Sequence, residues 1–451
     1  MDTQKLSLKE NFGHSFGIFG SSIIYAFLNT FLMKYYTDVI EITPAVIGTL
    51  FFIARIWDAI NDPIMGLVVD KTNTRWGKFR PYVLITPIFI VISTILLFTV
   101  PDISMTGQII YAYITYIIWG MVFTINDIPI WGLSSAVTKN IKERKKHVSF
   151  LTVFQMIGNA LPGIVGASLL IMFGGENIGT SYTKLAALVA IIGGIGFIVA
   201  FFTTKERVEI TPQKENKGFL QIFKAAFSNK VMIVFVIFML FNTSFGAIYA
   251  TINIYFAQYV LNDVKLLGLL MFMLVLGQIL GTIVGPLISF KIGNKKTLIC
   301  NFILYASLFT VYYFIGYESI VIVSIFTMIG GFLMGIPGVL MTAMLSDIGE
   351  YVHWRYGVKA EGVIFSTKTF GTKLSAGFVA FLVSITLTLV NYVPNVTQTA
   401  SATNGIFAIV TFLPVLFSIG SLIPLFFYNL TEEYSVSIRD ELEKRGDGTG
   451  A

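Results

Sequence analysis

Long apolar stretches separated by short polar loops follow one another along the whole chain of 451 residues. Each of them is near or above the roughly 20 residues that a helix needs to cross a bilayer. Lipid offers the backbone no hydrogen-bond partner, so each stretch is predicted to be a helix. The pattern therefore predicts an all-α membrane protein with about twelve transmembrane helices, at residues 16–37, 44–69, 81–100, 107–134, 148–173, 184–203, 231–260, 265–290, 297–315, 319–345, 361–391 and 405–428.

These stretches form two sets of six around a polar, basic segment. Gly48-Thr-Leu-Phe-Phe in the first set has a counterpart in Gly268-Leu-Leu-Met-Phe in the second, and a basic loop follows each after one helix. A parallel repeat of this kind predicts two six-helix halves, although any two helix–loop–helix hairpins share some likeness. The predicted parts are an N-terminal half at 1–203, a cytoplasmic linker at 204–230, a C-terminal half at 231–430 and a cytoplasmic tail at 431–451.

Composition and charge agree with a membrane setting. Hydrophobic residues make up 55% of the chain and charged residues only 12%, against about 25% charged in soluble proteins. Alternating loops along the chain differ in charge: one set holds most of the Lys and Arg residues. The other set, expected on the opposite side of the membrane, carries little positive charge beyond Lys34, Lys184 and Lys265. By the positive-inside rule, the basic loops and both termini are expected in the cytoplasm of a cell-membrane protein. The loops on the basic side hold Lys71, Arg75, Lys78, Arg80, Lys139, Lys142, Arg144, Lys145, Lys146, Lys205, Arg207, Lys214, Lys217, Lys291, Lys295, Lys296, Arg355 and Lys359.

Several functions are disfavoured by what the sequence contains. The loop asymmetry accounts for the net charge of +6, so no nucleic-acid partner is expected. The single cysteine, Cys300, disfavours a disulfide framework or a cysteine metal site. No nucleotide-binding P-loop, zinc-protease motif or nucleophile–base set is visible, so neither an enzyme nor a cofactor is expected. Of the three histidines, His147 and His353 are predicted to lie in cytoplasmic loops, and only His14 to reach a cavity.

The most informative polar positions lie inside the stretch at 44–69. Arg55, Asp58 and Asp62 are spaced i, i+3 and i+7, so they share one helical face, with Asn61 at its edge. A carboxylate at membrane depth is costly and normally faces a partner or a water-filled path. The stripe predicts a cation or proton site of a transport protein; a purely structural ion network is the alternative. The equivalent positions in the second half are uncharged: Gly277, Gln278 and Gly281. Ion coupling is therefore expected in the first half.

Three longer segments resemble the glycoside–pentoside–hexuronide:cation symporters of the major facilitator superfamily. They are Arg55–Gly66, Trp119–Trp131 and Ser346–Gly362. The loop at Gly66–Arg80 is similar to the loop between helices two and three of that superfamily, and Tyr392–Asn395 is a weaker match. The resemblance covers nearly the whole chain. It implies the two-halved facilitator fold, and inward symport of a sugar or glycoside with a cation by alternating access, by a monomer.

The resemblance also assigns residues to a cation site. It implies that the cation is held by Asp58, Asn61, Asp62 and Thr124, and that Asp127 touches both cation and sugar. Carboxylate, amide and hydroxyl oxygens suit Na⁺, whereas two carboxylates one turn apart also suit a proton, so the coupling ion stays open between Na⁺ and H⁺. The basic residues of the Gly66–Arg80 loop, with Lys142 and Arg144, are expected to make gating or structural contacts on the cytoplasmic side.

The resemblance further implies a sugar site with Trp131 and Lys373. The alternatives are an interfacial aromatic for Trp131 and a snorkelling side chain for Lys373. At other positions the chain departs from the family pattern. In helix one, Ser15 replaces an acid of the family and is preceded by His14. In helix five, Thr152 or Gln155 replaces an arginine. In helix eleven, Lys368 replaces a glutamine and is followed by Thr369.

These departures bear on the substrate. Losing an acid and gaining a cation would suit an anionic sugar such as a hexuronide, because a buried cation needs a compensating charge. Neutral oligosaccharides, glycosides and pentosides are the other candidates. Outside the sugars, a facilitator of lipids or drugs would share the fold without needing Asp127 and Trp131 together. A membrane sensor would need a signalling domain, which is not visible.

Overall fold

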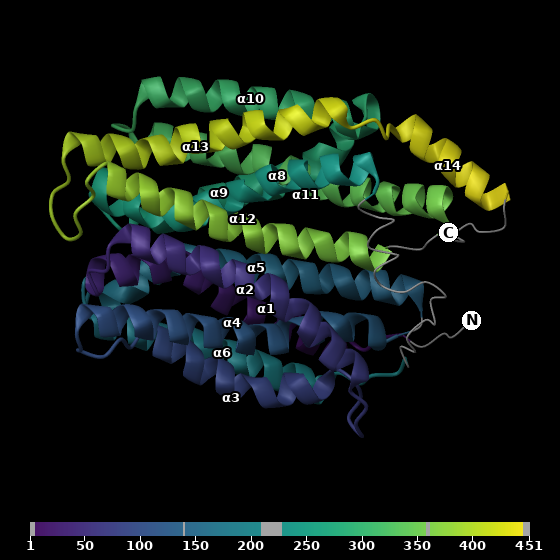
Figure 1. The fold of residues 1–451 in the computed structure, drawn as a ribbon, viewed down its shortest axis with the longest axis horizontal. Coiled ribbons are helices and arrows are strands. Elements are labelled where there is room, and N and C mark those ends of the chain that lie inside the picture. Colours follow the sequence, from purple (N-terminus) through teal and green to yellow (C-terminus); the bar gives the residue numbers. More distant parts are fainter. Residues whose placement is uncertain (1–4, 139, 209–227, 358–360, 445–451) are drawn as a thin grey trace. The chain divides into compact units, whose positions relative to one another are not determined.

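The fold is described from a computed structural model, which covers residues 5–138, 140–208, 228–357 and 361–444 (Figure 1). Within these ranges it contains twelve helices that are long and apolar enough to cross a membrane, so this prediction is confirmed. The helices up to the linker are α1 (Leu8–Lys34) with the π-helical turn η1 (Tyr35–Val39), α2 (Pro44–Lys71), α3 (Arg80–Leu97), α4 (Met105–Ala136), α5 (Ile141–Phe173) and α6 (Gly179–Thr203).

The second half of the chain is also helical in every described long segment. Its elements are α8 (Lys230–Tyr255) with the π-helical turn η2 (Phe256–Val260), α9 (Leu266–Ile292), α10 (Asn294–Ile315), α11 (Ile320–Tyr356), α12 (Glu361–Leu389), α13 (Ala400–Phe427) and α14 (Glu432–Lys444). The predicted tail at 431–451 thus contains a helix that the apolar pattern did not indicate, because α14 is charged rather than apolar.

Helix ends follow local chemistry. Ser7 accepts a hydrogen bond from the Glu10 amide, and the Glu10 carboxylate accepts from the Ser7 amide, a capping box that begins α1. Pro44 begins α2, where its missing N–H costs nothing. Gly357, at φ 61°, ends α11 in the left-handed conformation that glycine adopts without strain.

The chain divides into two compact units. Unit 1 comprises residues 1–213, 250–271 and 380–402, and unit 2 comprises 214–249, 272–379 and 403–451. Unit 1 therefore contains, besides α1 to α6, the end of α8 with η2, the start of α9, and the α12–α13 connection. This division differs from the simple halves at 1–203 and 231–430, because two later segments pack with the first six helices.

In unit 1, α1 packs against α5 and α6. Gly20 of α1 lies so close to α6 that a Cβ there would stand 2.5 Å from the Gly193 carbonyl oxygen. Aromatic rings fill the core beyond this crossing, with the Phe27 and Phe98 centroids 4.8 Å apart. The close approach of the backbones fixes α1 against α6, so the polar side chains of α1 are held in place by small residues.

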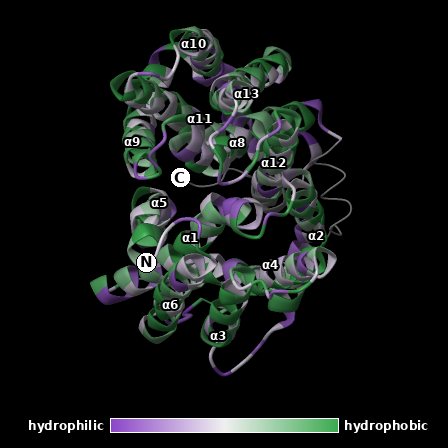
Figure 2. Ribbon diagram, turned by 90° about the vertical axis from the view of Figure 1, so that its left-hand side faces the viewer, coloured by the Kyte–Doolittle hydropathy of each residue, from purple (hydrophilic) through white to green (hydrophobic). Residues whose placement is uncertain are grey.

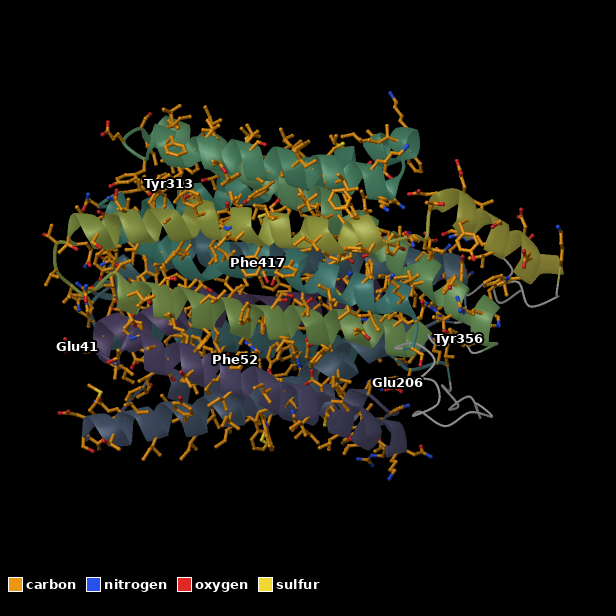
Figure 3. All side chains as sticks on the ribbon, turned by 45° about the horizontal axis from the view of Figure 1, so that its top comes forward. Glu41, Phe52, Glu206, Tyr313, Tyr356 and Phe417 are labelled. Carbon is orange, nitrogen blue, oxygen red and sulfur yellow. The ribbon has the colours of Figure 1, made fainter. Side chains whose placement is uncertain are left out.

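The Gly66–Arg80 loop is held by a residue that sequence reasoning did not single out. The Glu206 carboxylate, labelled in Figure 3, accepts hydrogen bonds from the Lys78, Phe79 and Arg80 amides at 2.8, 2.8 and 2.9 Å. The Arg80 guanidinium donates to the Phe201 carbonyl at 2.9 Å. A carboxylate on the first amides of α3 also meets the positive end of the helix dipole. Arg80 thus makes a structural contact; the Lys142 side chain lies outside the described part.

In unit 2, α9 and α11 cross at backbone contact. A Cβ on Gly277 would lie 2.0 Å from the Met328 carbonyl oxygen, and one on Gly281 would lie 1.9 Å from that of Phe332. These are the positions that correspond to the acidic stripe of α2. Glycine is needed there for packing, which explains in physical terms why the second half carries no carboxylates at these places.

Helix α14 is bound to α11 by ionic contacts in unit 2. The Arg439 guanidinium contacts Asp347 at 2.6 Å and Glu350 at 2.5 Å, and the Trp354 indole donates to Glu441 at 2.7 Å. The two carboxylates raise the pKa of the Arg439 guanidinium, with the Glu350 hydrogen bond as the main cause. Because Arg439 is half exposed, these pairs contribute modestly to stability.

Hydrophobic residues occupy most of the length of the helices in each unit (Figure 2). Large apolar side chains are exposed on these helices; Phe202, Phe290 and Phe314 are 71%, 86% and 78% exposed. Soluble monomers rarely leave so much apolar surface open, whereas lipid tails solvate it without cost. The chain is therefore a multi-pass membrane protein.

Several residues that were predicted in loops lie in helices. Lys34 lies in α1 and is fully buried, because Asp38 one turn later neutralises it. His147 lies in α5 and is fully buried, and His353 lies in α11. Helices α5 and α11 extend further beyond the apolar stretches than hydropathy indicates, since polar residues near their ends are bonded within the protein.

Candidate functional site

The acidic stripe of α2 faces α4 in unit 1. Arg55 and Asp58 are both 5% exposed, and their side chains form an ion pair at 2.8 Å. Arg55 also donates to the Tyr116 hydroxyl at 3.0 Å and lies over the Tyr25 ring. On the other side of the carboxylate, a Cβ built on Gly120 of α4 would stand 3.2 Å from Asp58 Oδ1. One oxygen of Asp58 is thus neutralised, and the other faces a glycine.

Further along the same face, Asp62 accepts a hydrogen bond from Thr124 Oγ1 at 2.9 Å. Asn61 is half-buried, and its amide nitrogen has no hydrogen-bond partner within the described ranges. Asp127 lies three residues after Thr124 on α4 and accepts from Ser21 Oγ of α1 at 2.8 Å. The structure therefore brings together the predicted cation residues of α2 and α4, and joins α1 to them through Ser21.

The prolines of these two helices add acceptors. Pro63 lies inside α2 and Pro129 inside α4, and each lacks the N–H that would bind the carbonyl four residues earlier. Carbonyl, carboxylate, amide and hydroxyl oxygens of this kind are the ligands that Na⁺ prefers, and paired carboxylates can also share a proton. Across the described residues, no three His, Cys, Asp or Glu side chains converge as a transition-metal site would require.

The alternative interpretation of the acidic stripe, a purely structural ion network, agrees with part of the geometry. Arg55 pairs with Asp58, as an ion network would require, whereas Asp62 turns toward Thr124. A buried pair that only locked helices would gain little over packed apolar residues. Asp62 accepts a hydrogen bond from the Thr124 hydroxyl, and Asp127 accepts one from the Ser21 hydroxyl.

The predicted sugar residues of unit 1 do not all meet. Trp131 is half-buried on α4, one turn after Asp127. His14 is fully buried and bonded to the Ile130 carbonyl, and the Ser15 hydroxyl donates to the Asn11 carbonyl at 2.7 Å. The residue of α1 that reaches Asp127 is Ser21, two turns further along the same face, so the structure does not bring His14 or Ser15 to Asp127.

The two candidates on α5 differ in exposure. Thr152 is exposed, and its hydroxyl donates to the Val148 carbonyl of its own helix at 2.9 Å, whereas Gln155 is half-buried. A hydroxyl bonded within its own helix has little capacity left to hold a ligand. Of the two residues considered for the helix-five position, Gln155 has the less exposed side chain.

The remaining candidates lie on α12 in unit 2. Lys368 donates to Thr342 Oγ1 at 2.9 Å and lines a cavity of about 240 Å³. Lys373 is half-buried, and the side chain of Thr369 lies outside the described part. The cavity mixes polar and aromatic side chains in its lining, as is typical of small-molecule sites. It is lined in part by Asn242, Thr243, Gln278, Tyr305 and Met341.

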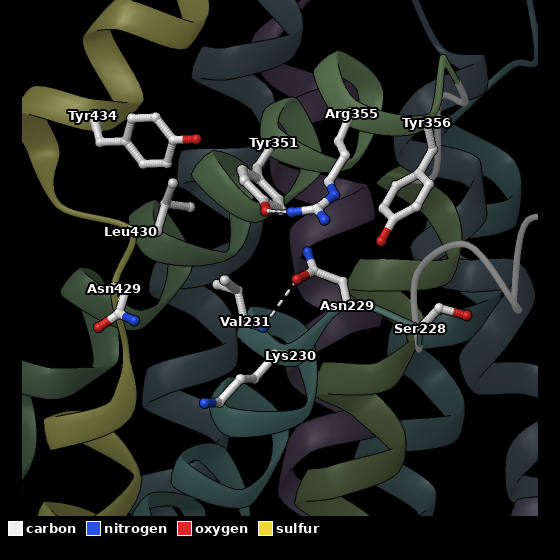
Figure 4. Close-up of a pocket in the computed structure, with 10 residues that line it drawn as sticks. All are labelled: Ser228, Asn229, Lys230, Val231, Tyr351, Arg355, Tyr356, Asn429, Leu430 and Tyr434. Atoms are coloured by element: carbon white, nitrogen blue, oxygen red, sulfur yellow. Dashed lines mark hydrogen bonds between the residues drawn. The ribbon is translucent and has the colours of Figure 1, made fainter.

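A second cavity of unit 2, of about 300 Å³, is shown in Figure 4. Arg355 points into it and donates to the Tyr351 hydroxyl at 2.6 Å, while Asn229 Oδ1 accepts from the Val231 amide at 2.9 Å. Among the described residues, those that line this cavity include none of the predicted substrate or cation residues. The cavity therefore does not compete with the α2–α4 set as the transport site.

Unit 1 also contains a fully buried ion pair that sequence reasoning missed. Lys34 Nζ lies 2.7 Å from Asp38 Oδ2, and both side chains are 0% exposed. Asp38 also accepts from the Tyr259 hydroxyl and, at 2.7 Å, from that of Tyr392, while Asn395 donates to its backbone carbonyl at 2.6 Å. Burial raises the pKa of the Tyr392 hydroxyl. The pair thus joins α1 and η1 to both later segments of unit 1.

The described residues thus combine twelve candidate membrane spans with carboxylates on two neighbouring helices, a pattern typical of membrane transport proteins. The family model for MFS/sugar transport proteins matches residues 13–432, so the chain belongs to that family of the major facilitator superfamily. It is 31% identical over 450 residues to the uncharacterized symporter YjmB of Bacillus subtilis (strain 168), covering 99% of this chain and 97% of that protein.

Two further comparisons add to this. The chain is 30% identical over 426 residues to the isoprimeverose transporter of Lactiplantibacillus pentosus, covering 93% of this chain and 88% of that protein. The crystal structure of the nucleoside transporter NupG matches with a TM-score of 0.68 at 13% identity, covering 93% of this chain and all of that one. At that identity the second likeness shows the fold alone, and the predicted facilitator fold is confirmed.

Proposed function

We propose that this chain imports a sugar or glycoside across the cell membrane together with Na⁺ or H⁺, as a monomer with both termini in the cytoplasm and without a bound cofactor. The cation would be held by Asp58, Asn61, Asp62 and Thr124, and Asp127 would contact both cation and sugar. The observation that carries the proposal is the contact between the two helices: Thr124 bonds Asp62, and Gly120 leaves Asp58 Oδ1 facing α4.

Asp127 is suited to a shared role because it lies between the two sites. It follows Thr124 by one turn and precedes Trp131 by one turn on α4, and Ser21 fixes one of its oxygens. A carboxylate can accept hydroxyl hydrogens of a sugar while an aromatic ring covers an apolar sugar face. A change at Asp127 should therefore affect both cation and sugar binding.

A neutral glycoside or pentoside is the first substrate class, in keeping with the name of the isoprimeverose transporter among the relatives. Lys368 favours a second candidate, an anionic sugar such as a hexuronide. Its ammonium is half-buried at a cavity and bonded to a neutral hydroxyl, Thr342. A carboxylate on the ligand would compensate this charge.

The test is uptake of labelled glycosides into membrane vesicles with an imposed Na⁺ or H⁺ gradient. Asp58→Asn and Asp62→Asn should each abolish concentrative uptake, because each loses the charge that holds the ion. The matched control is Asp102→Asn, an exposed carboxylate outside the transmembrane helices. Undiminished concentrative uptake in both variants would exclude this cation site.

Substrate class is decided by competition. If the ligand is anionic, a glucuronide should inhibit uptake more strongly than its neutral glucoside, and Lys368→Gln should remove that difference. Equal or weaker inhibition by the glucuronide would exclude the anionic candidate and leave the neutral class.

A further inference from the structure

Two histidines contact each other in a buried part of unit 1, outside the proposed cation site. His14 of α1 and His147 of α5 are both 0% exposed, and His14 Nδ1 lies 2.8 Å from His147 Nε2. His14 Nε2 lies 2.8 Å from the Ile130 carbonyl oxygen of α4, and His147 Nδ1 lies 2.7 Å from Asn11 Oδ1. Three hydrogen bonds thus run in a row from α4 through both rings to the start of α1.

Counting hydrogens along this row gives an uneven result. The row ends on an oxygen at both sides, so His14 Nε2 and His147 Nδ1 must each carry a hydrogen. The central nitrogen pair then needs one more hydrogen between its two atoms. Two neutral imidazoles carry only two hydrogens, so a neutral pair would leave two lone pairs facing each other at 2.8 Å. Three hydrogens satisfy every contact.

The orientation of Asn11 is fixed by a separate contact. Its amide nitrogen donates to the Ser7 carbonyl at 3.1 Å, and that carbonyl also accepts from the Asn11 backbone amide at 3.1 Å. Turning the amide over would place its oxygen against the Ser7 oxygen, which cannot donate. Asn11 therefore presents an acceptor to His147, and the pair cannot be completed by a flipped amide without losing another bond.

Several charged groups of both signs lie near the pair. Glu10 stands one turn before His14 on α1 and is ion-paired with Arg207 from the segment after α6. On α5, Glu143 stands one turn before His147 and accepts from the Leu6 amide at 3.2 Å, with Arg144 beside it. From α4 comes the Ile130 carbonyl, with Asp127 three residues earlier. In the described part of the chain, none of these charged groups is hydrogen-bonded to either ring, so the hydrogen-bond pattern is the main argument for the extra proton.

We infer that His14 and His147 together form a proton-binding site that holds one proton between the two rings. The charge is spread over two imidazoles and met by carbonyl oxygens at both ends, which lowers the cost of burying it. This site is separate from the α2–α4 cation set. It connects α1, α4 and α5 at one point, so parting the rings would remove the contact that shares the proton.

The chain offers a direct count of this proton, because it contains three histidines. In protein labelled with ¹⁵N-histidine and carrying His353→Gln, the remaining signals belong to the four nitrogens of the pair. At pH 7 we expect three hydrogens on these nitrogens, so a single nitrogen is left unprotonated or two share the central hydrogen. Two fully unprotonated nitrogens at pH 7 would mean a neutral pair and would overturn the proposal.

A second variant changes the count without touching either ring. Asn11→Leu removes the acceptor at one end, so His147 no longer needs a hydrogen on Nδ1, and two unprotonated nitrogens should appear. Ser15→Ala is the matched control: its hydroxyl donates to the backbone carbonyl of Asn11, and its loss should leave the count at three. An unchanged count in Asn11→Leu would also overturn the proposal. This measurement does not depend on sugar transport, so a failure of the proton site can be distinguished from a failure of the proposed function.

Discussion

The buried pair of Lys34 and Asp38 allows a quantitative prediction. Asp38 Oδ2 faces the Lys34 ammonium at 2.7 Å, while Oδ1 accepts from the Thr37 and Tyr392 hydroxyls, each at 2.7 Å. An asparagine at 38 can keep an oxygen toward Lys34 and let the two hydroxyls turn to accept. It cannot supply the negative charge, so Asp38→Asn leaves the fully buried Lys34 ammonium without its carboxylate and with the neutral Gln258 side-chain oxygen as a remaining partner.

The two members of the pair should not contribute equally. Removing one partner of a buried ion pair costs about 3–5 kcal/mol, and we expect this range for Asp38→Asn. Lys34→Met should cost less, about 1–3 kcal/mol, because three hydroxyls continue to donate to Asp38. The double variant should be more stable than Asp38→Asn alone, since no unpaired charge remains.

Thermal unfolding of the four proteins, followed by tryptophan fluorescence in one detergent, measures this order. The exposed Asp102→Asn serves as the control for a lost carboxylate and should unfold like the unchanged protein. If Lys34→Met were less stable than Asp38→Asn, or the double variant were the least stable of all, the reasoning from unpaired charge would be wrong.

Three further substitutions test packing and contacts. Gly120→Ala places a methyl group 3.2 Å from an oxygen of Asp58, so the Na⁺ or H⁺ concentration for half-maximal uptake should rise; an unchanged value would contradict the site. Ser21→Ala removes one hydrogen bond to the α4 carboxylate and should weaken sugar binding by about 0.5–1.5 kcal/mol in calorimetry, whereas unchanged affinity would place the sugar elsewhere. Gly281→Ala meets a carbonyl oxygen of α11 at 1.9 Å and should lower the unfolding temperature, while Gly66→Ala, with nothing within 4 Å, should not; equal temperatures would contradict the close crossing.

Periodicity and composition were enough to predict the helices and one face of the site. The spacing of Asp58 and Asp62 requires that they share a side of α2, and the same holds for Thr124 and Asp127 on α4. These relations lie within single helices, where geometry is fixed by the backbone. The contact of Asp62 with Thr124 then needs only that the two faces meet, as they do.

Contacts between helices were harder to predict. Ser15 was expected to face the sugar site, and Ser21 is the residue that reaches Asp127. His14 and Ser21 are seven residues apart, so they lie on nearly the same face of α1 but about 10 Å apart along its axis. Periodicity gives the face of a helix and not the level at which a neighbour crosses it. That level is set by small residues such as Gly20 at the α6 crossing.

Charge created a similar error at Lys34. A lysine near the end of an apolar stretch normally marks the start of a loop, because an unpaired ammonium is costly in lipid. Asp38 stands one turn later on the same face, and this i, i+4 spacing was the available signal that the lysine could be buried. The partners that complete the pair, Tyr259 and Tyr392, lie more than 200 residues away in the chain. Their part in it could be learned only from the fold.

The polar contacts of α1 occur at three levels, and this arrangement bears on how the protein works. His14 bonds α4 and α5 near one end, Ser21 bonds α4 in the middle, and Lys34 pairs within the segment that holds Asp38 near the other end. The groups at both ends are buried and Asp127 in the middle is half-buried, so breaking a contact at either end without replacement costs about 1–3 kcal/mol, and more where a charge is left. If the sugar binds Asp127 as proposed above, it acts at the middle level, where Ser21 donates to this carboxylate. We expect movement of α1 during transport to exchange partners at one end while the other end stays bonded, because breaking both ends together would cost more than a single hydrogen bond at the middle level contributes.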